Sequence, residues 1–469
     1  MPVRTAVPAQ AIDFDAIRAE LSIPDSYPPD AVAEAVRVAQ LPPAGDPLAV
    51  PFVTIDPVGS KDLDQAVHLA RDGQGYVVQY AIADVASFVP DGGAIADESW
   101  RRGATLYSPD RSTPLHPLEL SEGAASLLPG QDRPAVLWTI RLDARGEPTA
   151  VGVRRTVVRS QAQLSYPAVQ VDADASRLHP SIALLPEIGR LRRERSRDRH
   201  AITLDIPDAE IVRGPDGHWT LELRAVLPVE QYNAEISLLT GMCAAAMMLD
   251  GGVGLLRTLP APTTEQVRAL RKATAALGIP WPDDEPPGDV IGRLDGSRPR
   301  DAAFLEDAVR LLRGAGYTPF NGSPPQRREH GGVGAPYAHV TAPLRRLADR
   351  YATEICLALH AGTPIPAWAT RALPELGRAM SAADRRASEL AKACSGAVSV
   401  FVLHGRESEE FRATVLQIEP DRDRAVVVLH EPPVRAHCDP GGLAEGSVIR
   451  VRLLSADPAT HRFVVEPVG

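Results

Sequence analysis

In the stretch Thr54-Ile55-Asp56-Pro57-Val58-Gly59-Ser60-Lys61-Asp62-Leu63-Asp64-Gln65, three carboxylates follow an apolar strand within nine positions. Asp62 and Asp64 are two residues apart, so in an extended segment their side chains face the same way. Asp56 can fold back towards them through the turn at residues 57–59. Carboxylate oxygens are the hard ligands that Mg²⁺ prefers, and Mg²⁺ usually keeps waters and recruits substrate phosphate to complete its octahedron. The stretch is therefore a candidate magnesium site.

Other interpretations of this acidic loop stay open on spacing alone. A D-x-D loop can be merely solvated, or it can bind calcium. The EF-hand pattern requires a third alternate acidic or amide position, then a Gly and a distal Glu, and none of these is in register here. A catalytic metal site and a solvated loop thus remain alternatives.

A second constellation is an arginine-rich segment, His339-Val340-Thr341-Ala342-Pro343-Leu344-Arg345-Arg346-Leu347-Ala348-Asp349-Arg350. We expect a helix over residues 341–360, with Thr341 as its N-cap and Pro343 in its first turn. Arg345 and Arg346 would then project from a helix N-terminus, where free N–H groups favour an anion and forked guanidiniums suit a phosphate. The alternative is local ion pairing with Asp349, which contributes only ~0.3–0.5 kcal/mol when exposed.

The remaining periodicity predicts an α+β chain. Short helices are expected over residues 14–21 and 30–39, and longer ones over 184–199, 228–249, 264–277 and 299–314. Strands are expected over 53–55, 66–69, 76–85, 136–142 and 150–158. Four final strands, over 411–418, 425–429, 447–455 and 461–466, indicate a small OB-type barrel.

Composition limits the classes of function. The 469 residues carry a formal net charge of −10, which excludes nucleic-acid binding by bulk basicity but not by a local basic path. Lysine occurs only at Lys61, Lys272 and Lys392, so nearly all positive charge is arginine. The four cysteines are far apart, which favours a reducing compartment. The N-terminus lacks an apolar signal region and the longest apolar run is about 12 residues, so we expect a cytoplasmic protein without a membrane span.

Taken in order, the two constellations resemble the catalytic domain of the RNB family, the ribonuclease II and ribonuclease R exoribonucleases. The resemblance runs from about residue 53 to residue 393 and includes further blocks in family order: Ile82-Ala83-Asp84-Val85, Tyr107-Ser108-Pro109-Asp110-Arg111, Pro114-Leu115-His116-Pro117, Leu120-Ser121, Ser126-Leu127, Glu235 with Leu238-Leu239, Arg257 with Pro262, and His330 leading to Tyr337.

This resemblance implies three segments. A short helical N-terminal segment at residues 1–50 precedes an α+β RNB catalytic domain, a mixed sheet surrounded by helices, at residues 51–396. A small C-terminal OB-type, S1-like RNA-binding barrel follows at residues 397–469. The N-terminal cold-shock domains of well-known members are not expected, because 50 residues cannot hold two OB-folds.

The activity implied by the resemblance is that of a hydrolytic, processive 3′→5′ exoribonuclease. It would degrade single-stranded RNA from its 3′ end to nucleoside 5′-monophosphates with Mg²⁺, or with Mn²⁺ in its place. By position, Asp56, Asp62 and Asp64 match family aspartates that hold metal, and Asp64 matches the one tied to the chemical step.

Substrate contacts are implied in the same way. Tyr107 matches the tyrosine that stacks at the 3′-terminal nucleotide. Arg345 matches the arginine that contacts the reacting phosphate, with Arg346 beside it. Glu235 and Tyr337 complete the expected substrate-binding set.

The clearest departure from the family pattern is Gln65, which stands where the family has a fourth aspartate. A neutral amide can still ligate through its oxygen, so Gln65 stays in the predicted metal set, although a second metal would be held more weakly. The alternative function is a catalytically impaired RNA-binding relative in which Gln65 marks a decayed metal site. We expect a monomer in either case.

Overall fold

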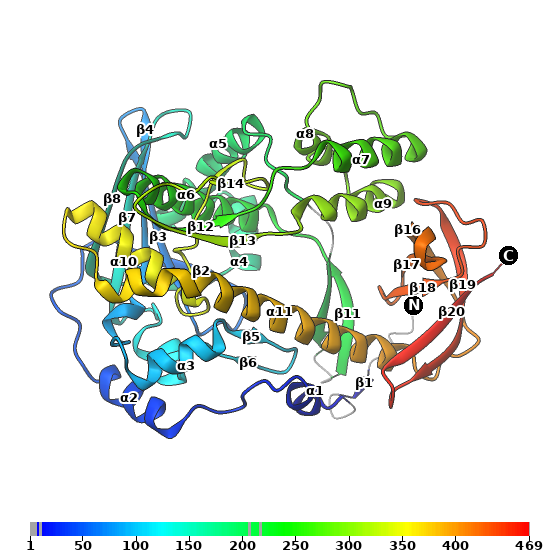
Figure 1. Ribbon diagram of the computed structural model, residues 1–469, viewed down its shortest axis with the longest axis horizontal. Coiled ribbons are helices and arrows are strands. Elements are labelled where there is room, and N and C mark those ends of the chain that lie inside the picture. Colours follow the sequence, from blue (N-terminus) through cyan, green and yellow to red (C-terminus); the bar gives the residue numbers. More distant parts are fainter. Residues whose placement is uncertain (1–6, 9–11, 205–207, 215–217, 469) are drawn as a thin grey trace.

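Six strands form a mixed sheet in the larger, N-terminal part of the molecule (Figure 1). The computed structural model describes residues 7–8, 12–204, 208–214 and 218–468. The strand order is β8-β7-β4-β3-β2-β9, and the pairing is antiparallel except between β2 and β9. The mixed sheet is therefore confirmed; its strands are β2 (Val53–Asp56), β3 (Gln65–Asp72), β4 (Gly75–Ala83), β7 (Asp132–Leu142), β8 (Pro148–Arg159) and β9 (Ala162–Ser165).

A tight hairpin between β3 and β4 fixes the register at the middle of this sheet. Asp72 pairs with Gly75 at the turn, which leaves Gln65 opposite Ile82 at the far end. A Cβ atom at Gly75 would lie 2.0 Å from the carbonyl oxygen of Leu142, so only glycine fits where β4 starts beside β7. Because β2 ends at Asp56 and β3 begins at Gln65, the acidic loop lies at one end of the sheet.

Three helices pack apolar side chains into the same core as the sheet: α5 (Leu185–Asp198), α6 (Pro228–Gly251) and α10 (Leu347–Ala361). Trp138 of β7 is fully buried in this core, as are Leu239 of α6 and Ile355 of α10. Among the described residues, α6 is the one helix long and apolar enough to cross a membrane, with a mean hydropathy of 1.2. Half of that stretch is buried inside the protein, a property that core helices share.

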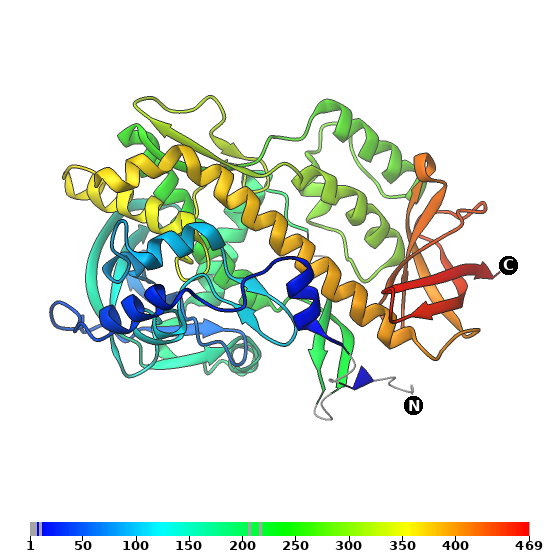
Figure 2. The same ribbon diagram turned by 60° about the horizontal axis from the view of Figure 1, so that its bottom comes forward.

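A single long helix, α11 (Ala367–Leu403), connects the sheet domain with the C-terminal barrel (Figures 1 and 2). Its 37 residues span about 55 Å at the α-helical rise of ~1.5 Å per residue. Leu373 and Leu376 near its start belong to the core of the sheet domain, whereas Val398 and Val402 near its end belong to the core of the barrel. The helix is continuous through residues 396 and 397, where the sequence predicts a domain boundary.

Five antiparallel strands form the predicted C-terminal OB-type barrel, in the order β18-β17-β16-β19-β20. The two outer strands, β18 and β20, approach each other, so the barrel is nearly closed. Four of the five strands were predicted, and the short β18 is additional; the strands are β16 (Glu410–Glu419), β17 (Arg424–Leu429), β18 (Arg435–Cys438), β19 (Val448–Asp457) and β20 (Arg462–Val468).

The N-terminal segment contains the two predicted helices, α1 (Phe14–Glu20) and α2 (Pro29–Ala39), after a strand β1 (Val7–Pro8). The helix predicted over residues 299–314 is shorter: α9 (Pro299–Ala308) is followed by a 3₁₀ turn at Val309–Leu312. A hairpin of β10 (Asp208–Arg213) and β11 (His218–Arg224) was not predicted. The remaining helices and strands are α3 (Ala94–Arg102), β5 (Leu106–Tyr107), β6 (Ser112–Thr113), α4 (Tyr166–Asp174), β12 (Val253–Thr258), α7 (Thr264–Leu277), α8 (Pro287–Ile291), β13 (Gly316–Asn321), β14 (Glu329–His330) and β15 (Ala335–Pro336).

Candidate active site

Backbone contacts hold the acidic loop between β2 and β3 in one conformation. The turn after β2 closes with a hydrogen bond from the Ser60 N–H to the Pro57 carbonyl, 3.2 Å long. Leu63 is fully buried, and its N–H donates to Ser126 Oγ at 2.9 Å. The Leu127 N–H donates back to the Leu63 carbonyl at 3.0 Å. The buried leucine thus anchors the loop and fixes the positions of its two neighbouring aspartates.

Asp64 is the most buried of the three carboxylates. Its Oδ1 accepts a hydrogen bond from the Leu344 N–H at 2.8 Å, and its Oδ2 lies 3.6 Å from Arg345 Nε. Burial raises the pKa of Asp64 to about 8, while Arg345 acts in the opposite direction. The acidic loop and the arginine segment, 280 residues apart in the chain, therefore meet at the Asp64 side chain.

Asp56 and Asp62 are less buried than Asp64. Burial raises the pKa of Asp56 to about 6, and the charge of Asp62 adds to this shift. Burial also raises the pKa of Asp62, whose Oδ2 accepts a hydrogen bond from the Tyr107 hydroxyl at 3.3 Å. Asp56 Oδ2 is buried and has no hydrogen-bond partner. When all three carboxylates are ionised, the charge of Arg345 offsets theirs only in part, and a cation would neutralise the remainder.

The donor chemistry of the three carboxylates suits a divalent cation. Hard oxygen donors are the ligands that Mg²⁺ and Mn²⁺ take, and the buried, unpartnered Oδ2 of Asp56 is a donor of this kind. In the part of the chain that the structure describes, no three His, Cys, Asp or Glu side chains are grouped closely enough to hold a metal by themselves. Water and substrate phosphate would have to supply the other ligands.

Gln65 has partners at both ends of its amide. Its Nε2 donates to the Thr341 carbonyl at 2.6 Å, and its Oε1 accepts from the Tyr80 hydroxyl at 2.6 Å. The Tyr80 hydroxyl also lies 2.8 Å from Ser237 Oγ on α6. Gln65 therefore ties the start of β3 to α6 and to the arginine segment. Metal ligation by Gln65 stays a prediction, and it would have to share an oxygen that already accepts a hydrogen bond.

The arginine segment does not begin with the predicted helix N-terminus. Helix α10 starts at Leu347, and its N-cap is Arg346 rather than Thr341. The reason is Asp349, which is fully buried and accepts from the Ala342 N–H at 2.7 Å. This bond holds residues 341–346 in a turn, with the Arg345 and Arg346 N–H groups both directed to the Ala342 carbonyl.

The two adjacent arginines have different surroundings. Arg346 forms a forked ion pair with Asp349, Nε to Oδ1 at 3.0 Å and Nη2 to Oδ2 at 2.9 Å, so the local pairing considered from the sequence is present for Arg346. The Arg345 side chain is 47% exposed and points towards Asp64. Phosphate contact stays a prediction for both, and the geometry favours Arg345.

Of the predicted substrate-binding residues, Tyr107 is the most accessible, with 53% of its surface exposed beside Asp62. Glu235 is buried on α6, where burial raises its pKa and the charge of Arg192 on α5 is the largest opposing influence. Tyr337 is buried and packs edge-on against His330 and His339. In the described residues no hydrogen bond or ion pair joins Glu235 or Tyr337 to the three aspartates, and their substrate contacts stay predictions.

A family model described as "RNB domain" matches residues 47–360. The chain belongs to the RNB family. A second family model, "RNase II-type exonuclease C-terminal S1 domain", matches residues 409–468, which are the strands of the barrel. The RNB domain includes the acidic loop, Tyr107 and the arginine segment, so the predicted family is confirmed.

Several curated proteins are similar to this RNB chain. Ribonuclease R of Aquifex aeolicus is 27% identical over 428 residues, covering 85% of this chain and 59% of that protein. Ribonuclease R of Escherichia coli is 28% identical over 373 residues, covering 72% and 44%. The exosome complex exonuclease RRP44 homolog A of Arabidopsis thaliana is 29% identical over 320 residues, covering 65% and 34%. The chain thus spans between about a third and three fifths of the length of these relatives.

Solved structures share the fold. RNase R of Mycoplasma genitalium, in complex with ribose methylated single-stranded RNA, superposes with a TM-score of 0.86 at 18% identity, covering 97% of this chain and 77% of that one. Yeast Ssd1, described as a pseudonuclease, superposes with a TM-score of 0.68 at 18% identity, covering 87% and 51%. At such identities the likeness establishes the fold alone, which this RNase R and the pseudonuclease have in common.

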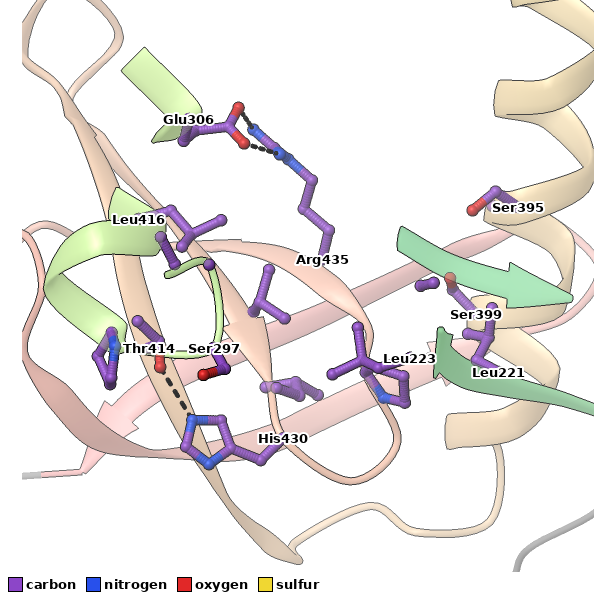
Figure 3. A pocket seen from close by; sticks show the side chains of 18 of the residues that line it. Leu221, Leu223, Ser297, Glu306, Ser395, Ser399, Thr414, Leu416, His430 and Arg435 are labelled. Atoms are coloured by element: carbon purple, nitrogen blue, oxygen red, sulfur yellow. Dashed lines mark hydrogen bonds and ion pairs between the residues drawn. The ribbon is translucent and has the colours of Figure 1, made fainter. Parts of the chain in front are cut away.

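A large pocket lies away from these carboxylates, between the RNB domain and the barrel (Figure 3). Its volume is about 970 Å³, and it is lined by Leu223 of β11, Ser399 of α11, Thr414 of β16 and His430 after β17. Glu306 and Arg435 form an ion pair at its edge, with Nη2 and Oε1 2.6 Å apart. None of the predicted site residues lines this pocket.

Sequence reasoning missed two polar residues of the RNB site. Tyr80 holds Gln65, and Tyr166, at the start of α4, accepts a hydrogen bond from Asn233 Nδ2 at 3.0 Å. Burial raises the pKa of Tyr166, and the charge of Asp56 adds to this shift. In the sequence, Tyr80 is one aromatic position of a buried strand, and nothing distinguishes it from core filler. Only the pairing of β3 with β4 shows that it faces Gln65.

Proposed function

We propose that this RNB-family chain is a divalent-metal-dependent hydrolase that shortens single-stranded RNA from its 3′ end and releases nucleoside 5′-monophosphates. The observation that carries the proposal is the convergence of Asp56, Asp62 and Asp64 with one half-exposed arginine, Arg345. The proposed partner is a free RNA 3′ end. Processivity, the monomeric state and the cytoplasmic location stay predictions.

Each residue of the open site has a chemical role in this proposal. The Arg345 guanidinium would contact a substrate phosphate and offset the negative charge that develops as water attacks it. Asp56, Asp62 and Asp64 would hold the cation, which supplies Lewis-acid stabilisation of the phosphate and activates water. The exposed ring of Tyr107 would stack on the terminal base, an interaction of ~1–3 kcal/mol that tolerates any sequence.

The second candidate function is an RNA-binding protein with impaired catalysis. The observation in its favour is Gln65, whose amide is neutral and whose two ends are bonded to Tyr80 and to the Thr341 carbonyl. A glutamine bonded in this way stabilises the fold and adds no negative charge to a metal site. The hydrolase function is favoured because the site still contains Asp56, Asp62, Asp64 and Arg345.

The test compares the wild-type chain with Asp64→Asn on a 3′ single-stranded oligoribonucleotide in the presence of Mg²⁺. We expect the wild type to release monophosphates, and the variant to lose at least about 10³-fold in rate, because a charged group needed in the transition state is gone. RNA affinity should change less than about threefold, since the side chain is buried and nearly isosteric.

The matched control is Asp46→Asn, an exposed aspartate before β2, which should keep wild-type turnover. Wild-type turnover in Asp64→Asn would show that the site is assigned wrongly. A wild-type chain that shifts RNA in a gel and releases no product would establish the RNA-binding alternative, and internal cleavage would indicate a different phosphodiesterase.

A further inference from the structure

Arg18 of helix α1 reaches into the turn that follows Tyr107. Its Nη1 lies 2.5 Å from Ser108 Oγ and 2.7 Å from Asp110 Oδ1, and its Nη2 lies 2.8 Å from Asp110 Oδ2. The Arg18 side chain is only 3% exposed, so this forked pair is largely removed from water on the arginine side. A forked guanidinium–carboxylate pair fixes both distance and direction, which a single contact cannot.

The same N-terminal segment contacts the turn from a second direction. Arg111 Nη2 donates to Asp15 Oδ1 at 2.8 Å and also pairs with Asp25. Because Arg18 also pairs with Asp15, the two arginines and their carboxylates form one network across the turn. Both ribbon views place α1 beside the β5–β6 hairpin (Figures 1 and 2).

A third contact holds the chain just after this hairpin. The Tyr27 hydroxyl donates to the carbonyls of Pro114 and His116. The Arg102 guanidinium lies 3.8 Å from the centre of the Tyr27 ring and donates to the Ser26 carbonyl at 2.7 Å. Residues 13–27 thus bind both the tip and the far end of the segment from Tyr107 to His116.

This segment leads directly to the candidate active site. Tyr107 donates to Asp62, and the preceding residues pair with the arginine segment: the Thr105 N–H donates to the Arg345 carbonyl at 3.0 Å. At the other end, His116 Nε2 lies 3.3 Å from the Pro343 carbonyl. Burial lowers the pKa of His116 to about 3, so its ring is neutral and donates to that carbonyl. A shift of the hairpin would therefore move Tyr107 and strain the backbone at Arg345.

The hairpin needs support from outside itself. Strands β5 and β6 contain two residues each, joined by the turn at Ser108–Arg111, and so short a ladder is marginal in water. Leu106 packs in the apolar core next to α11, but the turn itself is held by the polar contacts with Arg18, Asp15 and Asp25. The conformation of the turn is thus set by a segment that precedes the RNB match at residues 47–360.

We infer that Arg18 is a positioning residue for the active site: by holding Ser108 and Asp110 it keeps the Tyr107 ring at the site of the terminal nucleotide, and residues 13–27 are a functional part of the catalytic unit. The inference rests on the proposed function for its effect on turnover. Its structural half, control of the Tyr107 turn by Arg18, is independent of that function.

The test measures hydrogen exchange and RNA degradation on the full chain. In Arg18→Ala, amides of residues 105–113 should exchange at least about tenfold faster, while those of β7 stay unchanged, because only the local opening free energy falls. The kcat/KM for a single-stranded oligoribonucleotide should fall about 10- to 100-fold, mainly through KM, as expected when a binding group is misplaced by an ångström or less. Arg37→Ala, an exposed arginine on α2, is the matched control and should match the wild type in both measurements.

The double variant with Tyr107→Ala distinguishes positioning from general stability. If Arg18 acts through Tyr107, adding Arg18→Ala to Tyr107→Ala should cause no further loss of kcat/KM, whereas a fully additive loss would overturn the inference. Unchanged exchange in residues 105–113 of Arg18→Ala would overturn it as well.

Asp110→Asn disrupts the same forked pair by changing its more exposed partner. This variant is used for the test if Arg18→Ala does not fold. It should increase exchange in the same residues. A wild-type chain that releases no mononucleotides would refute the proposed function, while the exchange measurement would still decide the role of Arg18.

Discussion

Two halves of the same site differ in how their polar atoms are satisfied. In the open half, Asp56 Oδ2 lacks a partner, Arg345 is half-exposed, and the ring of Tyr107 faces solvent. In the locked half, Gln65 is bonded at both ends of its amide and Arg346 is paired through two hydrogen bonds with Asp349. The two halves adjoin in the chain, because Arg345 of the open half directly precedes Arg346 of the locked half.

This difference shows why neighbouring residues of one motif can have opposite roles. A buried polar group without a partner is costly, so it persists where a ligand completes it. A buried polar group whose bonds are all made stabilises one conformation of the backbone around it. The open half is thus suited to substrate and cation, and the locked half holds β3, α6 and α10 in the places that the open half needs.

The largest expected effect comes from replacing each of the two adjacent arginines by alanine. Arg346→Ala leaves Asp349 buried and unpaired, so we expect the free energy of unfolding to fall by about 3–5 kcal/mol. Arg345→Ala should change it by less than about 1 kcal/mol, because its partner distance is 3.6 Å and its side chain is half-exposed. The same Arg345→Ala change should lower kcat/KM for RNA about 10²–10³-fold.

Urea unfolding followed by circular dichroism, together with mononucleotide release, checks this pair of variants. A matched control is Arg177→Ala, an exposed arginine paired with Asp172 far from the site in sequence. Equal losses of stability in the two site variants would remove the distinction between the open and locked halves.

A smaller effect is expected from Gln65→Glu, which tests whether this position belongs to the locked half. The glutamate keeps the bond from Tyr80 but opposes the Thr341 carbonyl with a second acceptor, so without metal the free energy of unfolding should fall by about 1–3 kcal/mol. Tyr80→Phe, which removes the other bond, should cost about 0.5–1.5 kcal/mol. A gain in Mg²⁺ affinity for Gln65→Glu with no loss of stability would instead place residue 65 among the metal ligands.

The smallest expected effect is the pH dependence of cation binding by the three aspartates. The raised pKa values, about 6 for Asp56 and about 8 for Asp64, mean that the protonated carboxyls favour the metal-free fold and that this contribution is lost as pH rises through those values. Mg²⁺ binds the ionised carboxylates, so the increase in Tm on adding Mg²⁺ should be larger at about pH 8.5 than at about pH 6, by roughly 2 °C or more.

Differential scanning calorimetry with and without Mg²⁺ measures this increment. Asp64→Asn should flatten its pH dependence, because the group with the highest pKa is gone, while Asp46→Asn should leave it unchanged. The same increment at both pH values would indicate that the three carboxylates do not form the cation site.

Much of the fold could be predicted because its signals are local. Apolar patterning and turn residues predicted the strands on either side of the acidic loop and the helices over residues 14–21, 30–39 and 228–249. The structure confirms these elements to within two residues at each end of the helices. The start of α10 could not be predicted, because Thr341 and Pro343 satisfy every local rule for a helix N-terminus. The side chain of Asp349 overrides them from within the helix by binding the Ala342 N–H.

By itself, the sequence determined which chemical groups are present and in what order: three aspartates, a glutamine in fourth place, and two arginines far along the chain. Such patterns can be recognised in the sequence because they depend on residues that are neighbours in the chain. Only the tertiary structure decided which groups are free to act. The pairing of β3 with β4 brings Tyr80 to Gln65, and Arg346 forms an ion pair with the buried Asp349. The N-terminal Arg18 contacts the turn after Tyr107, about 90 residues away in the chain. Partnership and desolvation of this kind depend on contacts between distant segments, which no local pattern encodes.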